Sequence, residues 1–99
     1  MTQAAQFPAG EDPVKNMTEL VIEIAQALVD DPASVSVQAI ADGDATVIRL
    51  RVAQSDVGKV IGKQGRTARS MRTILSAASM KFRHRFSLDI VEQSDSPTP

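Results

Sequence analysis

The sequence has no cysteine, tryptophan or tyrosine, and only three phenylalanines among its 99 residues. Without cysteine there is no disulfide and no thiolate zinc site, which excludes a disulfide-stapled secreted scaffold. So few aromatic rings also argue against a ligand surface built on aromatic stacking. No apolar run approaches the roughly 20 residues that cross a bilayer, and the N-terminal stretch lacks the pattern of a signal peptide. We therefore expect one soluble, cytoplasmic domain with no membrane association.

The net charge is only −1, but it is distributed unevenly. Residues 1–48 hold one basic residue against eight acidic ones, a net charge of −7, whereas residues 49–99 hold ten against four, a net charge of +6. Such asymmetry indicates a surface in the second half that faces a polyanion. A domain whose two halves simply pair electrostatically remains the alternative.

The first half of the chain predicts one helix and a β-hairpin. Apolar residues from Met17 to Leu28 follow the i, i+3, i+4, i+7 spacing of an amphipathic helix. Asn16 is its expected cap, with Glu19 completing a capping box, and Pro32 lies beyond its end. Residues 34–40 and 46–52 alternate apolar and polar side chains around Asp-Gly-Asp at 42–44, which is typical of a hairpin.

The second half predicts two helices and a third strand. Ser55 is expected to cap a short helix through Ile61, a turn follows at 62–65, a longer helix spans 66–82, and residues 86–91 alternate as a strand. A strand reached by a long helical crossover is expected to be parallel. The prediction is an α+β fold, α-β-β-α-α-β, with a three-stranded mixed sheet and helices on one face. The domain is placed at residues 14–92, between disordered segments 1–13 and 93–99.

The glycines of VGKVIGKQGR do not fit two familiar nucleotide-binding loops. A Walker loop needs four residues between its glycines and a hydroxyl after its lysine, but three residues separate Gly58 from Gly62, and Gln64 follows Lys63. The dinucleotide fingerprint needs Gly-x-Gly first, which is absent. Glycines that merely join two helices remain one interpretation. The other is an anion site, because Gly-Lys-Gln-Gly lies at the start of a helix beside basic residues.

The segment VIGKQGRTA at 60–68 resembles the Val-Ile-Gly-x-x-Gly-x-x-Ile signature of KH domains, with Ala68 in place of a larger aliphatic residue. The order of elements resembles the type II KH fold. The stretch from Leu20 to Val91 resembles the KhpA family of small bacterial RNA-binding proteins.

This resemblance implies single-stranded RNA as the ligand, held by a loop that, in KH domains generally, clamps four backbone nucleotides. It implies a groove walled on one side by apolar residues around the loop and on the other by the second strand, 48–52, with arginines along its edge. The implied RNA-binding residues are Lys59, Val60, Ile61, Gly62, Lys63, Gln64, Gly65, Arg66, Ala68 and Arg69.

The resemblance further implies post-transcriptional regulation or RNA chaperoning, with a link to cell shape, as a homodimer or with a larger KH-containing partner, KhpB (Jag/EloR). A helical wheel places Ser70, Ile74 and Ala77 beside the core stripe as a candidate dimer patch, although Ile74 could instead widen the core. The alternative function is a protein-interaction scaffold with a KH fold and incidental RNA affinity.

No residue pattern predicts catalysis, since nothing places a nucleophile beside a base. We therefore expect no enzyme activity, no catalytic residue, no metal and no cofactor. His84, the single histidine, lies in the turn Arg-His-Arg and is expected to be solvated or to contact RNA weakly, while Phe82 and Phe86 are expected in the core.

Overall fold

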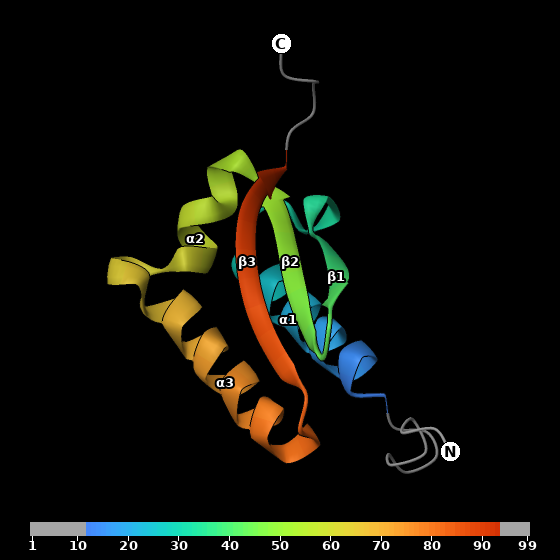
Figure 1. The fold of residues 1–99 in the computed structure, drawn as a ribbon. Coiled ribbons are helices and arrows are strands. Elements are labelled where there is room, and N and C mark those ends of the chain that lie inside the picture. The colour runs from blue at the N-terminus through green and yellow to red at the C-terminus, as the bar shows by residue number, and fades with distance from the viewer. Residues whose placement is uncertain (1–11, 94–99) are drawn as a thin grey trace.

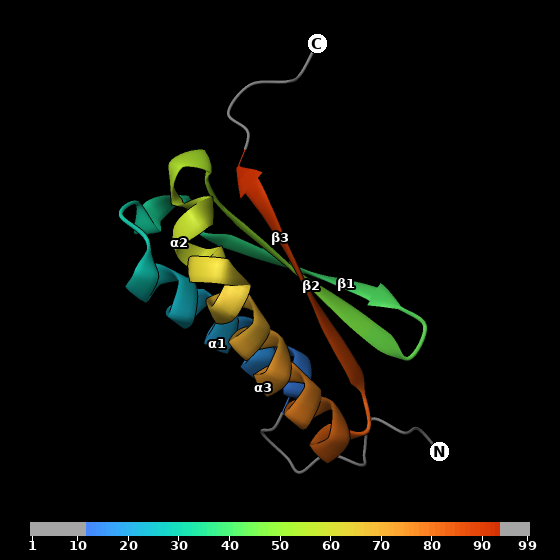
Figure 2. The ribbon, with the colours of Figure 1, turned by 90° about the vertical axis from the view of Figure 1, so that its left-hand side faces the viewer.

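The computed structural model describes residues 12–93, which form a two-layer α+β sandwich (Figures 1 and 2). The helices and strands are α1 (Pro13–Leu28), β1 (Ser36–Asp42), β2 (Ala45–Ala53), α2 (Val57–Ile61), α3 (Arg66–Phe82) and β3 (Arg85–Gln93). Single 3₁₀ turns occupy Pro32–Ser34, Gln54–Asp56 and Lys63–Gly65. Figure 2 shows all three helices on one face of the sheet. The expected fold class and element order are confirmed.

α1 begins earlier than the sequence pattern suggested. The prediction of Asn16 as its cap is wrong, because the Asp12 carboxylate accepts hydrogen bonds from the backbone N–H groups of Val14 (3.1 Å) and Lys15 (3.3 Å). Pro13 at the first helical position favours this start, since its φ suits a helix and its missing N–H is not needed there. The expectation of disorder at 1–13 and 93–99 is wrong for Asp12 and Pro13, which start α1, and for Gln93, which ends β3; the remaining positions lie outside the described residues.

The sheet is mixed and has the order β1-β2-β3. β1 pairs antiparallel with β2, as in the predicted hairpin, and β2 pairs in parallel with β3 over Ala45–Ala53. β2 is therefore the central strand, and β3 is an edge strand beside α3 (Figure 1). Because β2 is paired on both sides and β3 on one side only, β3 has a free backbone edge that a ligand can contact.

The core lies between the sheet and the helices. Alternate residues of β2 and β3 point toward the helices, and α1, α2 and α3 each bury an apolar stripe against them, as their periodicity predicts. Phe86 is buried there, as expected, and Phe82 packs against the core at partial burial. The buried cluster comprises Val21, Ala25, Ile48, Leu50, Val52, Val60, Met71, Leu75, Phe86 and Leu88.

Two polar side chains depart from the sequence interpretation. Ser55 does not cap α2, which begins at Val57 after a 3₁₀ turn whose Asp56 is 0% exposed. His84 is half-buried, with its Nε2 in hydrogen-bond contact (2.7 Å) with the Thr46 hydroxyl and its ring against Phe86, so it is not simply solvated. Within residues 12–93, no helix has the length and apolar character needed to cross a membrane.

Candidate nucleic-acid interface

The loop between α2 and α3 has an unusual backbone. Gly62 (φ 81°), Gln64 (φ 58°) and Gly65 (φ 74°) all have positive φ, a region that costs any residue except glycine. The Gly62 N–H closes α2 by donating to the Gly58 carbonyl (2.9 Å), and the Gly65 N–H donates to the Gly62 carbonyl (3.0 Å). The result is a tight turn that projects at the left of Figure 1 and leads directly into α3.

The two glycines of the loop are needed for different reasons. A Cβ built on Gly62 would collide with Thr67, lying 2.7 Å from its Cβ and 2.9 Å from its backbone nitrogen. A Cβ on Gly65 would meet nothing within 4 Å, so only the positive φ favours glycine there. Gly62 therefore holds the loop against α3, while Gly65 leaves open space above the helix start.

The start of α3 presents positive charge to solvent. Its N-cap, Gly65, has no side chain to accept a hydrogen bond; the Arg66 N–H donates to the Lys63 carbonyl, and no side-chain cap bonds the amides that follow. Lys63, Gln64, Arg66 and Arg69 are all exposed around this point. The Arg66 guanidinium donates to the Gln64 carboxamide oxygen (3.0 Å), which fixes one cation across the loop. An uncapped helix start flanked by cations is suited to bind an anion.

The apolar residues of the expected site lie beneath the loop. Val60 is 0% exposed and Ala68 is 3% exposed, while Ile61 is half-buried. Val60 belongs to the core cluster, so it supports the loop from below and presents no surface to a ligand. Of the apolar residues expected to wall the groove, only Ile61 keeps appreciable exposure.

Lys59 lies in the middle of α2 and takes part in an ion-pair network. Its Nζ is 3.4 Å from a carboxylate oxygen of Asp30 and 3.4 Å from one of Asp56. The hydrogen bond to Asp30 and the charges of both carboxylates raise the pKa of the Lys59 ammonium above its ordinary 10.5. Its charge is already matched inside the protein, unlike that of Lys63, for which residues 12–93 provide no ion-pair partner.

Asp56 has a structural role near the site that the sequence pattern did not predict. Its buried carboxylate accepts hydrogen bonds from the backbone N–H groups of Asp30 and Asp31, both at 3.1 Å, and so ties the end of α1 to the start of α2. Desolvation raises the pKa of Asp56, but these two bonds and Lys59 outweigh it and keep that pKa below its ordinary 3.8. No local pattern signals this role, because its partners lie 25 and 26 residues away.

A groove runs between α3 and β3. A pocket of about 180 Å³ lies there, lined by Arg72, Leu75, Phe86, Ser87 and Leu88. The Arg72 guanidinium donates to the Leu88 carbonyl (3.3 Å), which shows that backbone groups on this side of β3 are open to donors. The expectation that residues 48–52 wall the groove is wrong: Ile48, Leu50 and Val52 are fully buried in the central strand, and β3 is the strand that borders the groove.

The arrangement around the loop is suited to bind an anionic ligand. Within residues 12–93 there is no group of three or more His, Asp or Glu side chains placed to hold a metal ion. The exposed side chains around the loop are three cations and Gln64, and the groove beyond them has an apolar floor.

A family model described as "KhpA/KhpB, KH domain" matches residues 18–90. The chain belongs to the KhpA/KhpB KH-domain family. The matched residues include α2, the Gly62–Gly65 loop, α3 and the groove-lining part of β3. The resemblance inferred from VIGKQGRTA is therefore confirmed at the level of the family.

Curated members of this family are similar over most of the chain. An RNA-binding protein KhpA from Caldanaerobacter subterraneus subsp. tengcongensis is 48% identical over 75 residues, which cover 76% of this chain and 100% of the relative. One from Treponema pallidum is 47% identical over 74 residues, covering 75% and 92%. One from Halalkalibacterium halodurans is 49% identical over 76 residues, covering 77% and 100%.

A solved structure shares the fold at low sequence identity. Era in complex with MgGDPNP and nucleotides 1506–1542 of 16S ribosomal RNA aligns with a TM-score of 0.53 and 17% identity. The alignment covers 87% of this chain but only 34% of Era, so the likeness concerns one part of that larger protein. It supports the fold assignment alone.

Proposed function

We propose that this member of the KhpA/KhpB family binds single-stranded RNA, with the Gly62–Gly65 loop clamping the sugar-phosphate backbone. The loop itself carries the proposal: Gly62, Gln64 and Gly65 hold positive φ at an uncapped helix start, beside the unpaired charge of Lys63. Relatives at 47–49% identity bear the name RNA-binding protein, which supports the same ligand. KH domains as a class use such a loop to clamp four backbone nucleotides.

The bases are assigned to the groove between α3 and β3. With the phosphates on the loop, a strand passing along α3 meets the apolar floor of Leu75 and Leu88 and the outer backbone edge of β3. An edge strand has N–H and C=O groups free to bond base edges. Arg69 and Arg72 follow the loop on α3 at helical spacing and add positive charge along this path.

The proposal is tested by reversing charge on the loop. Lys63→Asp with Gln64→Asp places two carboxylates where phosphates are proposed, and aspartate tolerates the positive φ of position 64. We expect affinity for short single-stranded RNA, measured by fluorescence anisotropy, to fall about 100-fold, because charged hydrogen bonds are lost and repulsion replaces them. The melting temperature should stay within about 3 °C of wild type, because both side chains are exposed.

A matched control variant distinguishes an effect of the loop on RNA binding from an effect of net charge. Lys15→Glu with Gln26→Glu makes the same change in net charge on the exposed side of α1, and it should weaken RNA binding only slightly. Equal losses in the two double variants would contradict the clamp. RNA binding that is weak in wild type and unaffected by either variant would favour the alternative, a KH-fold scaffold with incidental RNA affinity.

We also propose self-association through the side of α3 that faces away from the groove. Ile74 is 44% exposed, so it does not widen the core, and exposed Ser70 and Ala77 lie beside it. A helix of a second copy could pack closely on such small residues. Pairing two weak clamps would raise RNA affinity through effective concentration, which suits a post-transcriptional regulator or RNA chaperone. A KhpB-type partner could use the same patch.

Ile74→Lys tests this patch without disturbing the core. Sedimentation should show a dimeric wild type and a folded, monomeric variant, since a lysine buried at an interface is costly. Leu28→Lys is the control, because Leu28 has similar exposure (40%) but lies on α1. A dimer that survives Ile74→Lys and dissociates with Leu28→Lys would move the interface to α1.

A further inference from the structure

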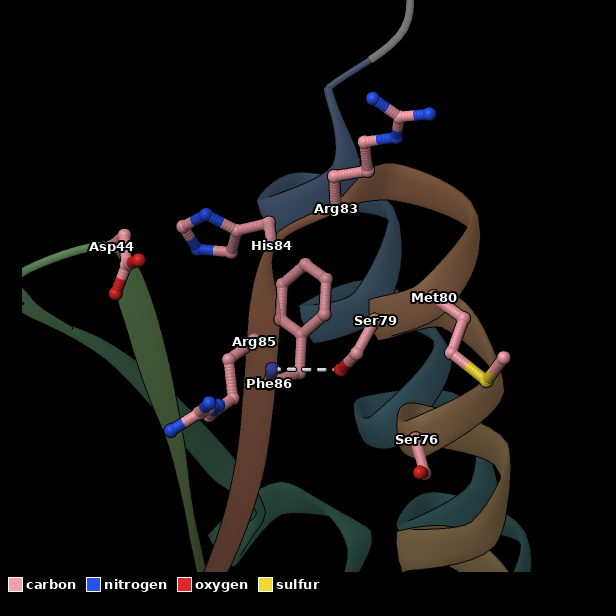
Figure 3. A pocket seen from close by; sticks show the side chains of 8 residues that line it. All are labelled: Asp44, Ser76, Ser79, Met80, Arg83, His84, Arg85 and Phe86. Carbon is pink, nitrogen blue, oxygen red and sulfur yellow. Dashed lines mark hydrogen bonds between the residues drawn. The ribbon is translucent and has the colours of Figure 1, made fainter.

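A second, larger pocket lies at the far end of α3 from the loop (Figure 3). It has a volume of about 490 Å³ and is walled by the last turns of α3, the hairpin turn at Asp44 and the start of β3. At about 1.5 Å per helical residue, Arg83 lies about 25 Å along α3 from Arg66, so this pocket is distinct from the clamp. The residues used below are Asp44, Met80, Arg83, His84, Arg85 and Phe86.

Arg83 occupies a position where glycine is the usual residue. It ends α3 in the left-handed conformation, with φ 55° and ψ 40°. Its N–H donates to the Ser79 carbonyl, and so does the N–H of His84 (3.2 Å), which is the pattern that normally selects glycine after a helix. A charged side chain kept at a strained position suggests that the guanidinium is needed where it projects, at the rim of the pocket.

The rest of the pocket is firmly built. The Ser79 hydroxyl donates to the Leu75 carbonyl (2.8 Å) and accepts the Phe86 N–H (2.9 Å), which joins α3 to β3. His84 is held between Thr46 and the Phe86 ring. Figure 3 shows Met80 on the helix side of the pocket and Arg85 on the strand side. The walls thus combine rigid backbone, two arginines and apolar surface, including a Met80 that is 81% exposed.

This pocket continues the groove described above. Phe86 lines both the pocket of about 180 Å³ and this larger one, so a strand that follows α3 away from the loop arrives here. We propose that the pocket is a second subsite for the same RNA strand, holding a nucleotide beyond those at the clamp. Arg83 and Arg85, which point in different directions (Figure 3), pair with the phosphates on either side of this nucleotide, and Met80 packs against its base. The inference rests on the proposed RNA-binding function.

Asp44 allows a second test, in which RNA affinity should change in the opposite direction. It is the acidic residue among those lining the pocket, and its carboxylate opposes the phosphates held by the two arginines. Removing the arginines must therefore weaken binding, and removing the charge of Asp44 must strengthen it. Both effects should appear only with RNA long enough to reach the pocket.

The experiment compares single-stranded RNA of four and about ten nucleotides by anisotropy. In the double variant Arg83→Gly with Arg85→Ala, affinity for the longer RNA should fall about tenfold. The slope of log affinity against log salt concentration should become shallower by about 1.4, because two phosphate contacts of about 0.7 each are lost. Affinity for the tetranucleotide should stay within about twofold. Glycine suits the backbone of position 83, so the melting temperature should not fall. Asp44→Asn should bind the longer RNA more tightly and the tetranucleotide unchanged.

Lys15→Ala with Arg51→Ala removes the same charge away from the pocket and should leave the length dependence intact. A double variant at Arg83 and Arg85 that keeps the wild-type length dependence, or loses the tetranucleotide as well, overturns the subsite while leaving RNA binding in place. Wild type that binds neither length overturns both the subsite and the proposed function. The double variant at Arg83 and Arg85 could instead lose binding to an acidic decapeptide that wild type binds, while its binding to RNA of every length is unchanged. That result would make the pocket a protein-binding site and overturn the proposal.

Discussion

Two lysines four residues apart, Lys59 within α2 and Lys63 just after its end, lie in different settings. Lys59 lies 3.4 Å from both Asp30 and Asp56, and the buried Asp56 accepts hydrogen bonds from two backbone N–H groups. Lys63 is exposed beside two glycines with positive φ, at a helix start without a side-chain cap. The first lysine therefore joins elements within the fold, and the second presents its charge outward.

A basic residue near a binding loop is therefore not by itself a ligand contact. Lys59 and Lys63 are four residues apart, and both were expected to bind RNA. Lys59 would have to leave two carboxylates to do so, whereas Lys63 gives up only water. We propose that Lys59 holds α2 in place and that Lys63 contacts phosphate.

The largest expected effect concerns the glycine that ends α2. Gly62→Ala should lower the melting temperature by about 10 °C, because the methyl group meets both the backbone and the side chain of Thr67 and positive φ is strained as well. Gly65→Ala should cost about half of that, since only φ is unfavourable. Thermal unfolding followed by circular dichroism measures both. Equal shifts would mean that the contact with Thr67 relaxes freely.

A smaller effect separates the two lysines directly. Lys63→Ala should weaken RNA binding about fivefold to tenfold without lowering stability, because an exposed, unpaired charge is lost. Lys59→Ala should leave RNA affinity within about twofold but lower the melting temperature, because the buried Asp56 carboxylate loses its ion-pair partner. Anisotropy and thermal unfolding on the same samples give the two readouts. Similar losses of RNA affinity in both variants would remove the distinction between Lys59 and Lys63.

The smallest effect is the acid sensitivity of the start of α2. The pKa of Asp56 is lower in the folded protein than its ordinary 3.8, so the folded state favours the carboxylate. Its contribution to stability is complete above pH 3.8 and is lost as the pH falls through the lowered pKa. Asp56→Asn should therefore be less stable than wild type at neutral pH, and the gap between their melting temperatures should narrow in acid. A constant gap would show that protonation of Asp56 does not contribute.

Local pattern was sufficient for most of the fold. One face of each of α1, α3, β2 and β3 packs against a shared core. The 3.6-residue periodicity of the two helices and the alternation of the two strands can therefore be read directly from the sequence. The parallel pairing of β3 followed from the length of the α2–α3 crossover. The predicted starts of α1 and α2 were less accurate, because more than one nearby residue could cap each helix. Asp12, before Pro13, caps α1 in place of Asn16, and α2 begins after the buried Asp56 and is not capped by Ser55.

The element order, the family signature VIGKQGRTA and the position of the loop could be predicted from the sequence, because all three depend on neighbours in the chain. Which charges are free, which strand borders the groove and where the second pocket lies became apparent only in the folded structure. Lys59 meets Asp30 across 29 positions, and His84 meets Thr46 across 38. Such contacts depend on how the helices pack on the sheet, and no periodicity records that packing.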